Sequence, residues 1–367
     1  MRTLRYIASY ARESAAGGVI AGLGSAQRNG AKTKKLLLGS IAAACCGLCA
    51  AAPAWSALTY TFTTLSIPGT PAGATVYGEA INDQGQVIVS ADTAGSYNFT
   101  VVDDIYNLHT GTYTPIPSYP GATPNSTGAF GINDAGQIVG DYHAAGIAWG
   151  GFLLSGGTFS PVTYPAGSTY SYPVGIGNNG EIVGFSLNSS GTALDGYSKV
   201  GSTYSDLNVP AAWGTGTIPG GVNKFGTIVG QYLPPGAPFN YYAAESFIYS
   251  GGTYTQVAGL PGYGWTSMIG INDLGQIVGY ASNDPVNGTD GEGFIYEGGT
   301  YIQFNDPLGV EGTYPVGINN LGDIVGDYVD GNGNYQIFVA VPTPEPSALL
   351  LLVSGLAGLG LVRQRRV

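Results

Sequence analysis

The side chains that most often carry out catalysis are scarce in this chain. Its 367 residues include two histidines, His109 and His143, and three cysteines, Cys45, Cys46 and Cys49, which all lie in one apolar stretch near the N-terminus. No Gly-x-Ser-x-Gly elbow leads into a helix, and neither a His-Glu-x-x-His pair nor a Cys-His metal spacing occurs. We therefore expect no enzyme activity, and the sequence indicates no catalytic residue.

Aromatic side chains offer binding chemistry instead. Tryptophan and tyrosine rings in variable loops can stack on sugar rings, with Asn and Asp nearby as hydrogen-bond partners. The competing interpretation is that the tryptophans pack between sheets or against their own loops. The candidate ligand-binding residues are Trp149, Trp213, Tyr241, Tyr242, Tyr263 and Trp265.

One acidic loop has the spacing of a calcium site. Asp330, Asn332 and Asn334 place oxygen ligands at alternate positions, as at the start of a Ca²⁺ loop. The bidentate Glu that closes a full EF-hand loop does not follow, and a solvated hairpin tip explains the same residues. Calcium is thus the one cofactor that the sequence suggests.

These residues must be positioned by a repeated segment that runs through the middle of the chain. Its clearest copy is the stretch 131–140, Gly-Ile-Asn-Asp-Ala-Gly-Gln-Ile-Val-Gly, and close copies occupy 270–279 and 317–326. Looser copies occupy 80–89, 175–184 and 221–230. The six equivalents of the motif's Asn stand at positions 82, 133, 177, 223, 272 and 319, at intervals of 44 to 51 residues.

Each copy predicts a β-hairpin. Asn and Asp side chains bond the backbone two residues on, and the Gly supplies the positive φ that closes the turn. The Ile-Val pair that follows gives one apolar side chain to each face of the sheet, which suits a sheet packed between two neighbours. Two further strands follow in each unit, as in 293–296 and 300–304.

Four antiparallel strands in every 40–50 residues are typical of a β-propeller blade. The last unit supplies only three strands, and the segment 59–69 resembles the fourth strands of other units. An N-terminal strand that completes the last blade would close the ring and remove two sheet edges. We therefore predict an all-β fold, a six-bladed propeller over residues 58–343. The uniform short turns would form its scaffold face, and the variable loops the opposite, binding face.

The units also resemble the HAF-type extracellular repeat, with its Gly-Ile-Asn-x-x-Gly-x-Val-Gly core and a downstream Phe-Leu/Ile-Tyr/Trp strand. The stretches 151–154 and 293–296 match that strand, whereas the His that precedes the Phe in the family is absent here. The resemblance implies an extracellular repeat protein and no particular activity.

The N-terminus predicts export. Residues 32–54 combine three lysines, the apolar run 36–51 and the small-x-small site Ala52-Pro53-Ala54, as in a signal peptide, and residues 1–31 are an extension or a mis-called start. With the cysteines inside this signal, no thiol chemistry is expected in the domain that follows.

The C-terminus has three parts: Pro344-Glu345-Pro346, the apolar run 347–362, and a cluster with Arg363, Arg365 and Arg366. Sixteen apolar residues are a short transmembrane segment, and the arginines would stay in the cytoplasm. A buried C-terminal helix is the alternative. Residues 344–367 resemble the PEP-CTERM sorting signal, which implies processing by a membrane exosortase in a Gram-negative, exopolysaccharide-producing bacterium.

Charge narrows the choice of partners. Residues 58–343 carry 21 acids against two bases, Lys199 and Lys224, a net charge of −19. A surface this acidic repels nucleic acid and anionic membranes. We therefore expect the protein to contact the membrane only through its terminal segments. The predicted partners are the Sec export machinery, exosortase and an extracellular polysaccharide.

The predicted function is a structural or ligand-binding propeller of the biofilm matrix or cell surface. The alternative is a propeller glycoside hydrolase or polysaccharide lyase, with paired carboxylates at the mouth of the central channel.

Overall fold

The computed structural model of the chain describes residues 59–71, 73–92, 101–145, 147–163, 170–187, 194–236, 244–284 and 290–343. Every regular element among them is a β-strand. None of these residues lies in a helix with the length and hydrophobicity that crossing a bilayer requires. The predicted signal peptide (32–54), its extension (1–31) and the predicted sorting segment (344–367) lie outside the described residues.

After β1 (Thr59–Leu65), the strands come along the chain in groups that each occupy one sequence repeat. The first three groups are β2 (Thr75–Ile81), β3 (Gln86–Asp92), β4 (Val101–Asn107), β5 (Thr112–Pro115), β6 (Thr127–Ile132), β7 (Ile138–Ala144), β8 (Ile147–Ser155), β9 (Thr158–Val162), β10 (Tyr170–Ile176), β11 (Ile182–Leu187), β12 (Leu194–Val200) and β13 (Thr203–Asp206). The last three are β14 (Thr215–Val222), β15 (Ile228–Leu233), β16 (Glu245–Ser250), β17 (Thr253–Val257), β18 (Trp265–Ile271), β19 (Ile277–Ser282), β20 (Glu292–Glu297), β21 (Thr300–Gln303), β22 (Thr313–Ile318), β23 (Ile324–Val329) and β24 (Tyr335–Thr343).

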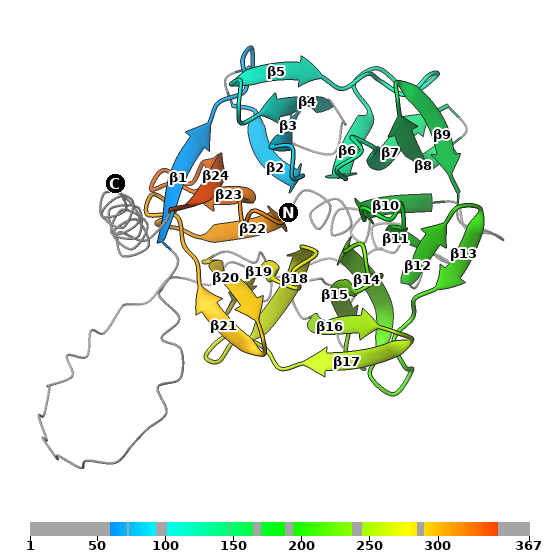
Figure 1. Ribbon diagram of the computed structural model, residues 1–367, viewed down its shortest axis with the longest axis vertical. Coiled ribbons are helices and arrows are strands. Elements are labelled where there is room, and N and C mark those ends of the chain that lie inside the picture. The colour runs from blue at the N-terminus through cyan, green and yellow to red at the C-terminus, as the bar shows by residue number, and fades with distance from the viewer. Residues whose placement is uncertain are drawn as a thin grey trace, which may run out of the picture. The chain divides into compact units, whose positions relative to one another are not determined.

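The groups form antiparallel sheets of four strands arranged as a β-propeller. Three sheets follow the chain order, β2 to β5, β14 to β17 and β18 to β21. Strands β6 to β13 form one eight-stranded sheet, whose two four-stranded halves are joined by a single parallel pair, Tyr170 opposite Trp149. The first strand of each group lies next to the axis, and the fourth strand lies at the rim in the five groups that have one (Figure 1).

The remaining sheet joins the two ends of the domain. Its order is β1-β24-β23-β22, so the N-terminal strand occupies the rim position of the last group. Tyr60 and Phe62 of β1 pack against Phe304, with ring centroids 4.9 and 5.2 Å apart, and Phe62 also contacts Phe338. The predicted N-terminal strand is confirmed, and it leaves no edge of β24 unpaired on that side.

The core is divided among the interfaces between neighbouring sheets. The Ile-Val pair of each repeat is buried, and its two members belong to different clusters. Ile138 packs with Ile88 of the preceding sheet, whereas Val139 packs with Ile182 of the following one. Val87 packs with Val325 of the last sheet. The predicted orientation of the pair toward opposite faces is confirmed, and it fills every interface around the ring.

The repeated turns also follow the sequence prediction. The glycine that ends each Asn-Asp-x-Gly turn has a positive φ, for instance 69° at Gly136 and 82° at Gly275. This glycine's N–H donates to the main-chain oxygen of the first turn residue, as in Gly275 to Asn272 at 3.2 Å. The motif therefore forms the hairpin between the two innermost strands of each group.

Candidate functional site

The repeated turns meet around the axis of the propeller, because they join the two strands nearest to it. Five of the six copies carry asparagine at the first turn position, and all five side chains are buried. In Asn272, Oδ1 accepts the backbone N–H groups of Leu274 and Gln276 at 3.1 and 2.9 Å. Its Nδ2 donates to Gln276 Oε1 at 2.8 Å and to the carbonyl of Asn319 in the next turn at 2.9 Å. One side chain thus closes its own hairpin and ties it to the neighbouring one.

These ties run from turn to turn around the axis. The Nδ2 atoms of the asparagines donate to main-chain oxygens in the order Asn82 to Asn133, Asn133 to Gly177, Asn223 to Asn272, Asn272 to Asn319 and Asn319 to Asn82, at 2.9 to 3.2 Å. Gly177 has no side chain and therefore makes no equivalent donation to the turn of Asn223. The last turn is bonded directly to the first, so the hydrogen bonds connect the two ends of the repeat array.

A second ring of polar side chains lies one residue further along each turn. A carboxylate or amide oxygen at this position accepts the backbone N–H of the preceding turn, at 2.7 to 2.9 Å. The pairs are Asp83 N–H to Asp134, Asp134 N–H to Asn178, Lys224 N–H to Asp273, Asp273 N–H to Asn320 and Asn320 N–H to Asp83. Together the two rings line a small polar mouth of about 60 Å³ at the turn end of the axis.

The carboxylates of this mouth are in different electrostatic states. Burial and the negative charge of Asp83 raise the pKa of Asp134, although the N–H of Asp83 opposes the rise. Burial would also raise the pKa of Asp273, but hydrogen bonds from Lys224 N–H, Asn320 and Asn178 and the charge of Lys224 together lower it. The Lys224 ammonium lies 3.6 Å from Asp273. The mouth therefore has a negative potential that Lys224 offsets only on one side.

The third position of the turns projects into solvent. It is Phe225, Leu274 and Leu321 in three consecutive turns, with 70, 67 and 62% of each side chain exposed. The other three turns carry Gln84, Ala135 and Asn179 at this position. The turn end of the propeller therefore exposes large apolar side chains over one half and none over the other.

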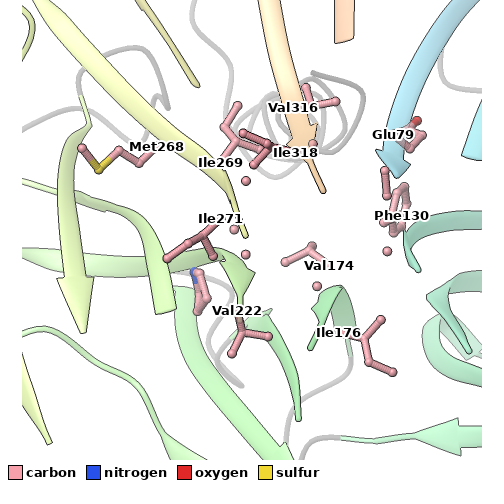
Figure 2. A pocket seen from close by; sticks show the side chains of 18 of the residues that line it. Glu79, Phe130, Val174, Ile176, Val222, Met268, Ile269, Ile271, Val316 and Ile318 are labelled. Carbon is pink, nitrogen blue, oxygen red and sulfur yellow. The ribbon is translucent and has the colours of Figure 1, made fainter. Parts of the chain in front are cut away.

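Behind the polar mouth lies an apolar cavity of about 140 Å³ along the axis. A ring of branched side chains separates the two, and its members line both: Ile81, Ile132, Ile176, Val222, Ile271 and Ile318. All six innermost strands contribute to the cavity wall (Figure 2).

A β-bulge interrupts each innermost strand at the same distance from its turn. The register shifts fall between Gly78 and Ala80, and at equivalent points in the other five strands. A bulge turns the extra residue out of the regular ladder and re-aims its side chain. The bulged residues all line the cavity, and they are Glu79, Phe130, Val174, Gly220, Ile269 and Val316. Among the described residues that line the cavity, Glu79 is the one with a charged side chain.

The predicted aromatic residues are not gathered at this cavity. Trp149 and Trp265 are packed in the core, with 8 and 6% of their surfaces exposed. Trp265 Nε1 donates to the carbonyl of Asp284 at 3.1 Å, and its ring contacts Tyr280. Trp213 is half-buried against Tyr232, with ring centroids 5.9 Å apart. Tyr263 is also half-buried, whereas Tyr241 and Tyr242 lie outside the described residues.

The burial of Trp149 and Trp265 corrects the expectation that both rings form an open stacking surface. Both residues stand on strands, and the sequence interpretation placed them in loops. A sugar-stacking role stays a prediction for Trp213 and Tyr263.

The predicted calcium residues form a closed turn. Asp330 Oδ1 accepts the N–H groups of Asn332 and Asn334 at 2.8 and 3.0 Å, and these two bonds lower the pKa of Asp330. Nδ2 of Asn334 contacts the other carboxylate oxygen at 3.3 Å. Nowhere in the described ranges do three His, Cys, Asp or Glu side chains meet as a metal site. Calcium binding stays a prediction.

The sorting-signal residues Pro344, Glu345, Pro346, Arg363, Arg365 and Arg366 lie outside the described part of the chain.

The sequence interpretation missed both Glu79 and the second ring of turn residues as parts of a site. The signal was present in the fixed spacing, since Asp83, Asp134 and Asp273 follow the motif's Asn directly. Spacing alone could not show that the six turns converge on one axis.

No family model matches the sequence, and no curated protein matches it. Among solved structures, the chain is similar to a mutant of AofleA from Arthrobotrys oligospora at 10% identity, over 78% of this chain and 91% of that one, with a TM-score of 0.46. It is similar to Trypanosoma rangeli sialidase in complex with the inhibitor DANA at 12% identity, over 77% and 56% of the two chains, with a TM-score of 0.45. The fucose-specific lectin from Aleuria aurantia has 13% identity over 74% and 97%, with a TM-score of 0.43. Identities this low say nothing about a shared ligand or reaction.

Proposed function

We propose that this chain is an exported, non-catalytic binding or structural module, built on a six-bladed propeller and held at the cell surface or in the extracellular matrix. The six-blade count is supported by the 24 strands of the described residues, which fall into six groups of four when β1 is counted with β22 to β24. It is also supported by the six turns, whose hydrogen bonds lead from the last back to the first.

The observation that carries a binding rather than a catalytic role is the chemistry of the axis. Hydrolysis of a glycosidic bond needs two carboxyl groups, about 5–9 Å apart, that flank the scissile bond. Glu79 is the one acid among the described residues that line the axial cavity, and the carboxylates of the mouth already accept backbone and amide hydrogen bonds. These groups act as structural ties, which favours a scaffold over a glycoside hydrolase or lyase.

Export and surface attachment are supported by the two ends of the sequence. The signal-like segment (32–54) and the PEP-CTERM-like segment (344–367) bracket the propeller. We propose that the Sec machinery exports the chain and that an exosortase processes it near Glu345. Mass spectrometry of the mature protein from its native host tests this: a C-terminus near Glu345 is expected, and an intact Arg366-Val367 end would contradict it.

Binding to extracellular polysaccharide is tested with a glycan array probed by the purified protein, followed by pull-downs from the host's matrix fraction. We expect saturable binding to a small set of glycans or one matrix protein. Silence in both assays would contradict the binding role and leave a structural one. Hydrolysis or elimination products from any arrayed glycan would instead favour the enzymatic alternative.

A further inference from the structure

The axial cavity has the size and lining of a site for a small apolar molecule. Its volume is about 140 Å³, and branched and aromatic side chains line it from all sides of the axis (Figure 2). A cavity of about this volume with apolar side chains in its wall can admit a molecule of the size of benzene. The two uncharged polar side chains in the wall, Gln231 and Ser267, bond each other at 2.9 Å. A sugar would find few hydrogen-bond partners here.

One side of this wall is charged. Glu79 stands at the bulge of β2, and it is the charged residue among six bulged residues that are otherwise apolar or glycine. The sheet of β14 lies across the axis from the sheet of β2 (Figure 1). Its bulged residue is Gly220, where an added Cβ would stand 2.7 Å from the carbonyl oxygen of Ile269. The wall opposite Glu79 is therefore closely packed backbone, with no charged side chain at the bulge.

The polar mouth adds a second reason to expect a cation. Asp83, Asp134 and Asp273 surround the turn end of the same axis, and Lys224 is paired with Asp273. Charges of one sign around a channel with low-dielectric walls concentrate counter-ions of the opposite sign. An anionic ligand is repelled from both the mouth and the cavity, whereas an organic cation is attracted to both.

We propose that the axial cavity binds a small organic cation with an apolar body, such as an aryl- or alkylammonium, whose charged group is held by Glu79. The inference deepens the proposed function and rests on it in one respect, that the propeller binds rather than transforms its ligand. It concerns the axis and not the loop-bearing surface that a glycan would contact.

Isothermal titration of the purified protein with benzylamine tests the proposal, with benzyl alcohol as the neutral probe of similar shape. We expect benzylamine to bind at least about tenfold more tightly, since a hydrogen bond to a charged group is worth that factor or more. In Glu79→Gln the preference should vanish, because the side chain keeps its size and loses its charge. Glu311→Gln is the matched control, since Glu311 is exposed and does not line the cavity.

A second variant locates the probe. Val174→Phe fills the cavity, and a phenylalanine already stands at the equivalent bulge, Phe130. Both probes should lose binding in this variant, while its thermal unfolding stays cooperative.

Three outcomes would overturn the proposal. Equal affinity for the two probes would show an apolar cavity without a cation site. Unchanged binding in Val174→Phe would place the probe elsewhere. Absence of binding by both probes would remove the cavity as a ligand site, while a positive glycan array would still support the proposed function.

Discussion

A single turn asparagine makes four hydrogen bonds, and this explains why the motif recurs. Asn272 accepts two N–H groups of its own turn and donates to Gln276 and to the carbonyl of Asn319. The sequence indicated the turn, because Asn and Gly have known roles there. The donation to the next turn depends on the closed ring, and one repeat in isolation carries no signal of it.

Replacement of Asn272 by alanine should therefore lower the free energy of unfolding by about 2–4 kcal/mol, because two partly buried N–H groups and the buried carbonyl of Asn319 lose their partner. Urea denaturation followed by tryptophan fluorescence measures the change. Asn332→Ala, at an exposed hairpin tip, is the control and should stay within about 0.5 kcal/mol of the parent. An equally small effect at Asn272 would contradict the role of the turn ring.

The carboxylates of the mouth should give the stability a pH dependence with a defined sign. The pKa of Asp134 is raised above 3.8 in the folded chain, so the folded state binds this proton more tightly. Ionisation of Asp134 is therefore less favourable in the folded chain than in the unfolded chain. The free energy of unfolding decreases as the pH rises from 3.8 through the raised pKa of the folded state. The pKa of Asp273 is lowered in the folded chain, so its ionised carboxylate stabilises the fold. This stabilisation is fully present above pH 3.8 and is lost as the pH falls through the pKa that Asp273 has in the folded chain.

Asp134→Asn should remove the charge and keep the oxygen that accepts the Asp83 N–H, since Asn178 and Asn320 fill the same position. It also loses the bond that Asn178 Nδ2 donates to Asp134 Oδ2 at 2.6 Å, and this loss is the same at every pH. We therefore expect the stability of the variant relative to the parent to rise by less than about 1 kcal/mol, discounted for solvent screening, between the pH values where Asp134 is protonated and neutral pH. Urea titrations of parent and variant across this range check it. A stability difference that does not depend on pH would contradict the assignment.

At the scale of the elements, the glycine that opens five of the six motifs lets neighbouring innermost strands approach closely. A Cβ added at Gly270 would stand 2.7 Å from the carbonyl oxygen of Val316, and one at Gly317 would stand 3.3 Å from Cα of Ala80. The sequence showed the glycine at this position in five copies, but only the packed ring gives the reason. The sequence did not predict the bulges for the same reason. The bulged residues are of unlike types, from Glu79 to Gly220, so no local sequence pattern marks the bulged position.

Gly270→Ala should destabilise the protein by about 1–3 kcal/mol, because the new methyl group meets backbone of the next sheet. The first repeat carries Ala80 at the same position, so Ala80→Gly serves as the matched control and should cost less than about 1 kcal/mol. Thermal and urea unfolding measure both variants. Equal, small changes would show that the sheets are less closely packed than the structure has them.

Strand β1 was predicted from the missing fourth strand of the last repeat, and the sheet order confirms it. Deletion of residues 59–65 should expose the edge of β24 and the faces of Phe304 and Phe338, so the protein should unfold at lower urea and form oligomers. A synthetic peptide of residues 59–67 should bind the deletion variant and restore its stability. A monomeric deletion variant as stable as the parent would contradict the closing role of β1.

At the scale of the whole molecule, the repeat predicted the architecture better than the site. Turn spacing, the Ile-Val pair and the displaced N-terminal strand each have local physical causes, so the sequence displays them. The axial cavity and its polar mouth arise where six separate segments converge, and the aromatic residues that looked most like a site, Trp149 and Trp265, are core residues. The sequence placed function on the face of variable loops, whereas the structure adds a second candidate on the axis.

We propose that the repeats close a ring around an axial cavity that binds a ligand and does not catalyse a reaction. A crystal structure of the purified protein grown with benzylamine would test this arrangement. We expect six four-stranded blades, β1 paired with β24, and the probe inside the axial cavity with its nitrogen within hydrogen-bond distance of Glu79. A ring with another number of blades, an axis filled by protein side chains, or the probe bound only at the surface would contradict it.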